Sequence, residues 1–114
     1  RVYQASFQAA MAIYQLSKSF PSEEKFSLTD QVRRSSRSVC ANLAEAFRKR
    51  RYPKNFVSKL SDCEAEVAET HVWLDFALAC DYVTIEEYEK LYKEYDMILG
   101  MLVRMIVEPE KWNL

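Results

Sequence analysis

Turn-forming residues are scarce in this sequence, which has one glycine and three prolines among its 114 residues. Because β-hairpins need such residues at their turns, the scarcity argues against a β-rich fold. Apolar residues are abundant (49% hydrophobic), which excludes a linker or a disordered tail. A chain of this length fits one domain with a sizeable core. The sequence therefore predicts a single domain over residues 1–114, made of long helices with short connections.

Histidine is equally scarce, since His71 is the only one in the chain. A carboxylate-bridged metal pair in a helix bundle needs two Glu-x-x-His motifs, and Ala68 occupies the position that would supply the glutamate. One histidine builds no Cys/His zinc site, and no glycine-rich loop is present to hold phosphate. We therefore expect no metal, no cofactor and no catalytic residue. We expect His71 to be a partly buried helical residue with a hydrogen-bond partner.

Long apolar runs are absent as well. No run approaches the roughly 18 residues of a transmembrane helix, and no basic-then-apolar signal peptide opens the chain. Cys40, Cys63 and Cys80 are odd in number and far apart, and each occupies an apolar helical position, which predicts buried, reduced thiols. A nucleophilic thiol paired with His71 is a disfavoured alternative. We therefore expect a cytoplasmic protein without membrane contact.

Apolar residues recur at three- and four-residue steps over about 2–20, 28–51, 53–80 and 85–107, which predicts four helices. Short links make successive helices antiparallel, so the expected fold is all-α, an up-down antiparallel four-helix bundle. The predicted core stripes of the last three helices are Leu28, Val32, Val39, Leu43 and Ala46; then Phe56, Leu60, Cys63, Val67, Thr70, Leu74 and Ala77; then Tyr88, Tyr92, Tyr95, Leu99, Leu102 and Ile106.

The first helix has two apolar stripes, and a face this wide predicts contact with more than one neighbour. The stripes are Val2, Ala9, Ile13, Leu16 and Phe20, and Tyr3, Phe7, Ala10 and Tyr14. The second helix adds a small polar stripe suited to hydrogen bonding at close helix approach, formed by Gln31, Ser35, Ser38, Asn42 and Glu45.

Helix ends and packing are signalled by single residues. Ser27 is a predicted N-cap with Asp30 in the capping-box position, and Thr84 with Glu87 matches the capping box Thr-x-x-Glu. Gly100 lies in the middle of a predicted helix, where glycine costs roughly 1 kcal/mol relative to alanine. We therefore expect close helix packing at Gly100.

Charge is segregated although the formal net charge is −1. Residues 31–60 contain nine Lys or Arg and one acid, Glu45, whereas residues 61–96 contain eleven acids and two lysines. The run from Arg48 to Lys54 places five cations and one tyrosine around a predicted helix end, more than capping of the helix dipole requires. The candidate nucleic-acid or partner-binding residues are Arg33, Arg34, Arg37, Arg48, Lys49, Arg50, Arg51 and Lys54.

Two interpretations of these cations stay open. An exposed basic surface can grip phosphates in a largely sequence-independent way. Alternatively, basic and acidic helices pair with each other within the bundle or between subunits, which gives a purely structural assembly. The sequence pI near 5.9 argues against a dedicated nucleic-acid binder.

Two segments resemble a known bacterial family. Phe20-Pro21 followed by residues 24–31 (EKFSLTDQ) and residues 38–45 (SVCANLAE) are similar to the motifs of four-helix bundle proteins encoded within intervening sequences of 23S ribosomal RNA genes. Arg33-Arg34, Phe56, Leu60, Glu69 and Tyr82 also fall where that family places similar residues. Ala46 replaces a usual glycine, and Ala65-Glu66 replaces a common Gly-Ser pair.

The resemblance implies a left-handed up-down bundle that assembles as a ring, typically a homopentamer, without known enzymatic activity. A related branch, the accessory variability proteins of diversity-generating retroelements, binds a reverse transcriptase and nucleic acid through a basic ring surface. By that resemblance the contacting positions here are Arg48, Lys49, Arg50, Arg51 and Lys54. We therefore expect a non-catalytic homo-oligomer that contacts RNA, DNA or a reverse-transcriptase-like protein.

Overall fold

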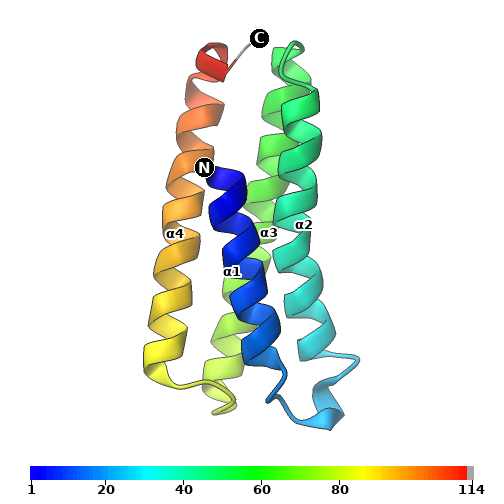
Figure 1. Ribbon diagram of the computed structural model, residues 1–114, viewed down its shortest axis with the longest axis vertical. Coiled ribbons are helices and arrows are strands. Elements are labelled where there is room, and N and C mark those ends of the chain that lie inside the picture. Colours follow the sequence, from blue (N-terminus) through cyan, green and yellow to red (C-terminus); the bar gives the residue numbers. More distant parts are fainter. Residues whose placement is uncertain (113–114) are drawn as a thin grey trace.

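The computed structural model describes residues 1–112, and its regular structure over that range is entirely helical (Figure 1). Short connections join the four long helices. Their bounds are α1 Val2–Ser17, α2 Leu28–Arg48, α3 Pro53–Ala79 and α4 Ile85–Val107, and two short 3-10 helices are η1 Ser22–Glu24 and η2 Pro109–Trp112.

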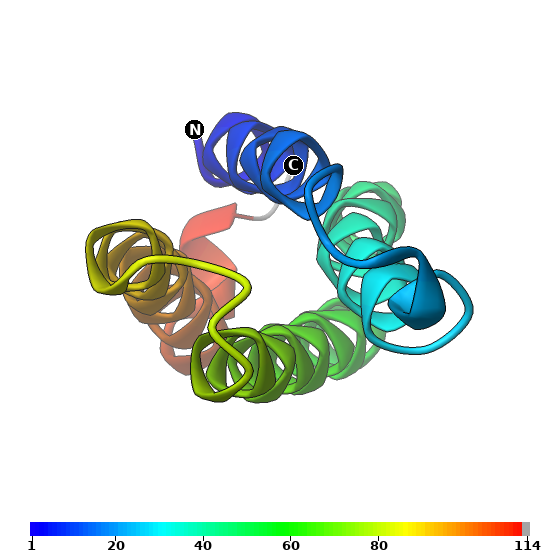
Figure 2. The same cartoon turned by 90° about the horizontal axis from the view of Figure 1, so that it is seen from below.

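The four long helices run up and down and enclose one core. Each packs against its neighbours in the chain, and α1 also packs against α4, which closes the bundle (Figure 2). The molecule is elongated, with extents of 45 × 25 × 18 Å. The predicted all-α, up-down four-helix bundle is confirmed. The final two residues of the predicted domain lie outside the described residues.

Helix ends differ from the predicted ones by up to three residues. α1 stops at Ser17 instead of residue 20, where the hydroxyls of Ser17 and Ser19 donate to the backbone oxygens of Tyr14 and Leu16. Such hydroxyls compete with continued helical hydrogen bonding. α2 stops at Arg48 instead of residue 51, because the chain turns there to begin α3 at Pro53.

The two predicted N-caps have different outcomes. At α4 the capping box is confirmed, since the Glu87 backbone N–H donates to Thr84 Oγ1 (3.1 Å) and the Thr84 N–H donates to Glu87 Oε1 (2.8 Å). At α2 the prediction is wrong, because Ser27 makes no side-chain cap. Its hydroxyl instead donates to Glu24 Oε1 (2.6 Å), which also accepts from the Leu28 N–H (3.4 Å).

The core confirms the predicted stripes of α2 and α3. Every stripe position of those two helices is buried, including Phe56, Leu60, Cys63 and Val67 at 0% exposure. The seven-residue repeat of α3 therefore marks the side that faces the other helices.

The stripe predicted for α4 is confirmed at Tyr95 and Leu102, but its other four positions lie beside the buried side of the helix. Its buried residues are Leu91, Tyr95, Ile98, Met101, Leu102 and Met105, whereas the predicted Tyr88, Tyr92, Leu99 and Ile106 are half-buried. The tyrosines lie towards α3: the Tyr88 hydroxyl donates to Asp75 Oδ1 (2.5 Å), and the Tyr92 ring stacks on His71 at 4.0 Å between centroids. A tyrosine combines an apolar ring with a polar hydroxyl, so it suits this half-buried edge.

Close approach of α2 and α3 occurs at the polar stripe, as expected. The hydroxyls of Ser35 and Thr70 are 2.8 Å apart and both residues are fully buried. Thr70 Oγ1 donates to the Glu66 backbone oxygen (2.8 Å), and Cys63 Sγ contacts the Val39 backbone oxygen at 3.7 Å. Small side chains here satisfy their polar atoms while the backbones come close.

Two packing predictions are wrong. A Cβ added at Gly100 would meet one neighbour within 4 Å, Nη1 of Arg104 at 3.9 Å, so within residues 1–112 no atom of another helix lies that close to it. Cys80 is exposed, whereas Cys40 and Cys63 are buried as predicted. Cys80 follows Ala77, the last buried residue of α3, and the chain leaves the helix there through Asp81 in the left-handed region (φ 61°).

Candidate nucleic-acid interface

The basic run of the sequence forms the connection between α2 and α3, at one end of the bundle (Figure 1). We call its five cations the turn cluster: Arg48, Lys49, Arg50, Arg51 and Lys54. All are exposed except the half-buried Arg50. Backbone hydrogen bonds hold the turn, from the Lys49 N–H to the Ala46 oxygen and from the Tyr52 N–H to the Lys49 oxygen, both 2.9 Å. The cations therefore project from an ordered turn.

One member of the turn cluster has a structural role. Arg50 Nε donates to the Phe47 backbone oxygen (3.0 Å), and its guanidinium lies 5.5 Å from the Phe47 ring centroid. The same carbonyl, in the last turn of α2, also accepts the Arg50 backbone N–H at 3.4 Å, so the side chain adds a second donor to it. Arg51 lies over the ring of Tyr52 at 5.9 Å, and Tyr52 is 54% exposed. The other cations make no such cap, so capping explains one of the five charges.

Carboxylates near the turn are engaged elsewhere. Glu45, the single acid in residues 31–60, accepts a 2.8 Å ion pair from Lys59, which also lies 3.6 Å from Asp62. The paired carboxylates raise the pKa of the Lys59 ammonium. Among residues 1–112 no carboxylate lies within ion-pair distance of the turn cluster. The turn cluster is therefore an uncompensated positive patch within the described chain.

Arg34 does not belong to a free basic surface. Its guanidinium pairs with both Glu66 (3.7 Å) and Glu69 of α3. This contact supports the alternative interpretation in part, because one basic residue of α2 does pair with the acidic helix inside the same chain. Burial raises the pKa of the Glu66 carboxyl, with a further contribution from the negative charge of Glu69.

Arg33 and Arg37 form a different group, which contacts α1. Arg33 Nε donates to Ser17 Oγ (2.8 Å). The guanidiniums of Arg33 and Arg37 lie 4.8 Å and 5.7 Å from the ring centroid of Tyr14, and Lys18 lies 4.8 Å from the same ring. Cation–π contacts of this kind hold three cations around one aromatic ring. Sequence reasoning missed Tyr14 and Lys18, although their four-residue spacing on one helix was a usable signal.

The structure thus divides the eight predicted residues into three environments. The turn cluster is free of carboxylates, Arg34 is paired with α3, and Arg33 with Arg37 surrounds Tyr14 of α1. The predicted position of the turn cluster at a helix end and turn is confirmed.

His71 is partly buried as predicted, but the predicted hydrogen bond is not formed. Its Nε2 atom is buried, has no hydrogen-bond partner in the described chain, and lies 3.7 Å from Asp96 Oδ1.

Burial raises the pKa of the Cys63 thiol to about 12 and also raises that of Cys40. A nucleophilic cysteine needs the opposite shift, towards a thiolate at neutral pH. These environments do not support the alternative of a Cys–His nucleophile at either buried thiol.

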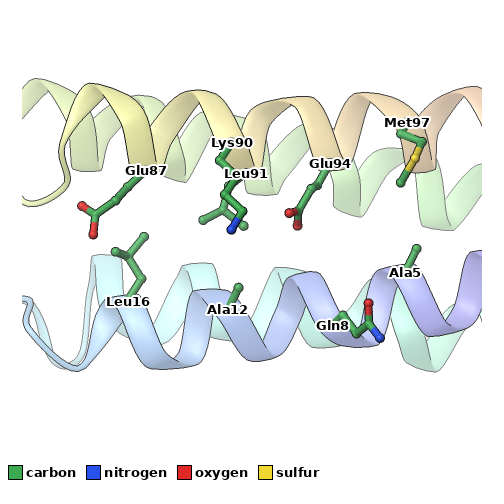
Figure 3. Close-up of a pocket in the computed structure, with 9 residues that line it drawn as sticks. All are labelled: Ala5, Gln8, Ala12, Leu16, Glu87, Lys90, Leu91, Glu94 and Met97. Atoms are coloured by element: carbon green, nitrogen blue, oxygen red, sulfur yellow. The ribbon is translucent and has the colours of Figure 1, made fainter.

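A groove of about 380 Å³ lies between α1 and α4 (Figure 3). Its walls are mainly apolar, with Ala12, Leu16 and Leu91 lining it, and Glu87 and Glu94 stand along the α4 side.

Within residues 1–112, no group of three or more His, Cys, Asp or Glu side chains is arranged to hold a metal ion. None of the described helices is both long and apolar enough to span a membrane.

Comparison with known proteins supports the resemblance seen in the motifs. A solved structure from Bacteroides thetaiotaomicron, described as a protein of unknown function from the S23 ribosomal protein family, superimposes with a TM-score of 0.84 at 31% identity. The match covers 93% of this chain and 98% of that one. No functionally curated protein matches the chain. The family model of the 23S rRNA-intervening sequence protein matches residues 1–104. The chain therefore belongs to the 23S rRNA-intervening sequence protein family.

Proposed function

We propose that this protein is a non-catalytic homo-oligomeric bundle that contacts the phosphate backbone of RNA or DNA through the turn cluster. The observation that carries the proposal is that four of these five cations are exposed and that none of the five has a carboxylate partner in residues 1–112. Arginine and lysine side chains in this state bind phosphate oxygens by charge-assisted hydrogen bonds. Tyr52, exposed beside Arg51, offers a ring face to an unpaired base.

The basic patch of one chain is small. Five cations make a few phosphate contacts, and the net charge of −1 gives no long-range attraction to nucleic acid. Several copies in one assembly would present several turn clusters, and multivalency would then strengthen weak contacts. The family resemblance puts the copy number at five. The exposed aromatic residues of α1 support self-association, because Tyr3 and Phe7 are 40% and 50% exposed.

The proposal includes a cytoplasmic location, where nucleic acid is present and unpaired thiols stay reduced. A reverse-transcriptase-like protein is the partner that the resemblance suggests. Such a partner would be recruited together with the nucleic acid.

Fluorescence anisotropy of labelled single-stranded RNA, structured RNA and duplex DNA tests this function at low salt. The informative variant is Arg48→Ala/Arg51→Ala/Lys54→Ala, which keeps Arg50 and its bond to the Phe47 oxygen. We expect the wild-type protein to bind and the triple variant to lose at least tenfold in affinity, about 1.4 kcal/mol.

The matched control removes three exposed cations from α4, as Lys90→Ala/Lys93→Ala/Arg104→Ala. It changes the net charge equally and should bind within twofold of the wild-type protein. Absence of wild-type binding, or equal losses in the two triple variants, would refute a role for the turn cluster.

A further inference from the structure

Three aromatic side chains gather at the end of the bundle opposite to the turn cluster, where the chain enters α2 and leaves α3 (Figure 1). Phe26 is 84% exposed and Phe76 is 54% exposed. Trp73 is half-buried and lies on the same side of α3 as Phe76, with 6.0 Å between the two ring centroids. The fold of one chain therefore leaves much of this aromatic surface uncovered.

All three rings line one pocket of about 440 Å³, which we call the aromatic pocket. Its other lining residues are Glu24, Ser27, Leu28, Gln31 and Cys80. Among these described residues, Glu24 is the only charged one. The Lys25 ammonium lies 5.3 Å from the Phe26 ring centroid, but Lys25 lines a neighbouring hollow with Arg33 and Arg37 instead. The aromatic pocket therefore combines three rings with a single carboxylate, in a volume typical of small-molecule sites.

The carboxylate of Glu24 is held in place by three donors. Its Oε1 atom accepts from the Ser27 hydroxyl (2.6 Å) and the Leu28 N–H (3.4 Å), and its Oε2 atom accepts from the Tyr82 hydroxyl (2.8 Å). The hydrogen bonds from Ser27 and Tyr82 hold the pKa of the Glu24 carboxyl below its ordinary value, so the group is negatively charged at neutral pH. These donors occupy most of the roughly four acceptor positions of a carboxylate. Glu24 therefore supplies the pocket mainly with charge.

The indole of Trp73 is also held by the chain itself. Its Nε1 atom donates to Glu69 Oε1 (3.2 Å), on a carboxylate that pairs with Arg34 as well. Because the N–H is used in this way, the ring offers a ligand its π-surface. Aromatic ring faces are electrostatically negative and attract cations, and those of tryptophan do so most strongly. The rings and the carboxylate thus favour the same sign of charge in a ligand.

We propose that the aromatic pocket binds a small organic cation whose charge lies on a quaternary methylammonium group. Such a group presents methyl groups to ring faces and has no N–H to donate, which suits a carboxylate whose oxygens are already bonded. A primary ammonium or a guanidinium needs several acceptors, and Glu24 has few left. This site is separate from the turn cluster and does not depend on the proposed function.

Tryptophan fluorescence tests the proposal in the Trp112→Phe background, where Trp73 is the only tryptophan. The probes are choline and 3,3-dimethyl-1-butanol, a neutral alcohol of the same shape. We expect choline to change the Trp73 emission saturably and the alcohol to bind at least tenfold more weakly. Equal affinity for the two probes, or no saturable change up to about 10 mM choline, would overturn the proposal. A trimethyllysine peptide that binds tenfold more tightly than choline would overturn the small-molecule assignment and give the site to a protein side chain.

A matched pair of variants locates the binding. Phe76→Leu removes one ring of the pocket but keeps an apolar side chain, and it should weaken choline binding at least fivefold. Phe7→Leu removes a similarly exposed ring (50%) of α1 that does not line the pocket, and it should bind choline within twofold of the parent. No loss in Phe76→Leu, or an equal loss in both variants, would overturn the site.

Glu24→Gln removes the charge with little change in shape and should also weaken choline binding at least fivefold. Because Glu24 also holds Ser27 and Tyr82, circular dichroism must show that this variant keeps its helices. The comparison of choline with the neutral alcohol tests the same charge effect without altering Glu24, so a misfolded variant leaves the test intact. Unchanged choline binding by a folded Glu24→Gln variant would overturn the role of the carboxylate.

Cys80 gives a second readout, because it is exposed and lines the aromatic pocket. Saturating choline should slow the alkylation of Cys80 by iodoacetamide at least threefold, whereas the neutral alcohol at the same concentration should not. An alkylation rate that choline leaves unchanged would place the bound cation outside the aromatic pocket and overturn the assignment.

Discussion

Ser35 of α2 and Thr70 of α3 share a buried hydrogen bond, with 2.8 Å between their hydroxyl oxygens. Thr70 Oγ1 also donates to the Glu66 backbone oxygen (2.8 Å), so its single proton is used and Ser35 is the donor to Thr70. Ser35 has one further acceptor nearby, the Val32 oxygen at 3.4 Å. Without Ser35, the Thr70 hydroxyl therefore keeps its acceptor. Without Thr70, the Ser35 hydroxyl keeps only the more distant Val32 oxygen.

This inequality predicts different costs for the two substitutions. Ser35→Ala leaves Thr70 bonded to Glu66 and should lower the free energy of unfolding by about 1 kcal/mol. Thr70→Val removes the acceptor of a buried hydroxyl and should cost about 1–3 kcal/mol. Urea denaturation of both variants measures the difference. Equal losses in the free energy of unfolding would show that the Ser35 hydroxyl bonds the Val32 oxygen as well as it bonds Thr70.

The different behaviour of the two predicted caps can be checked by a matched pair of substitutions. Thr84→Ala should lower the free energy of unfolding by about 1 kcal/mol, because it removes the acceptor of the Glu87 N–H. Ser27→Ala removes an exposed hydroxyl that caps nothing and should change it by less than about 0.5 kcal/mol. Thermal or urea unfolding compares them, and a larger effect at Ser27 would reinstate it as the cap.

Glu66 should make the protein more stable as the pH falls. Burial raises the pKa of its carboxyl in the folded state above the ordinary value of 4.5, so the folded chain binds the proton more tightly than the unfolded chain. The resulting stabilisation appears as the pH falls through the raised folded pKa and is complete below the unfolded one.

The variant Glu66→Gln removes this dependence, while Arg34 keeps its contact with Glu69. We expect the variant to be at least as stable as the wild-type protein at pH 7. As the pH falls towards 4.5, the free energy of unfolding of the wild-type protein should rise relative to that of the variant. Urea unfolding at pH 7 and pH 5 measures the gap. A variant that is less stable at pH 7 than at pH 5, relative to wild type, would contradict the sign.

Thiol labelling should separate one cysteine from the other two. Cys80 is exposed, whereas burial raises the pKa of Cys40 and raises that of Cys63 to about 12. A thiol-specific chromogenic reagent at pH 8 should therefore react with one equivalent quickly and with two slowly. Cys80→Ser should abolish the fast phase, and a fast phase that survives this change would place an activated thiol in the core.

Much of the fold follows from periodicity alone. In α3 the repeat from Phe56 to Ala77 locates the buried side because apolar residues recur without interruption, and no knowledge of the other helices is needed. In α4 the same reasoning wrongly places Tyr88 and Tyr92 at the centre of the core. Both count as apolar in the sequence, but they lie beside the polar groups of Asp75 and His71. A tyrosine in the sequence can therefore lie either at the edge of a core or in its centre.

The site was predictable in position but not in environment. The charge run from Arg48 to Lys54 locates a basic turn, since prolines and helix periods are local signals. Arg34 is paired because Glu69, 35 residues away in the chain, lies beside it. Ser27 does not cap α2 because its hydroxyl donates to Glu24 instead. Such choices are made by tertiary contacts, which sequence spacing does not encode.

The salt dependence of RNA binding tests the central claim most directly, because each phosphate contact releases counterions. With single-stranded RNA the logarithm of the association constant should fall linearly with the logarithm of the salt concentration, by about 0.7 per contact. Removal of Arg48, Arg51 and Lys54 should reduce that slope by about 2, and the α4 triple control should leave it unchanged. Binding whose slope is the same in all three proteins would contradict phosphate contact by the turn cluster.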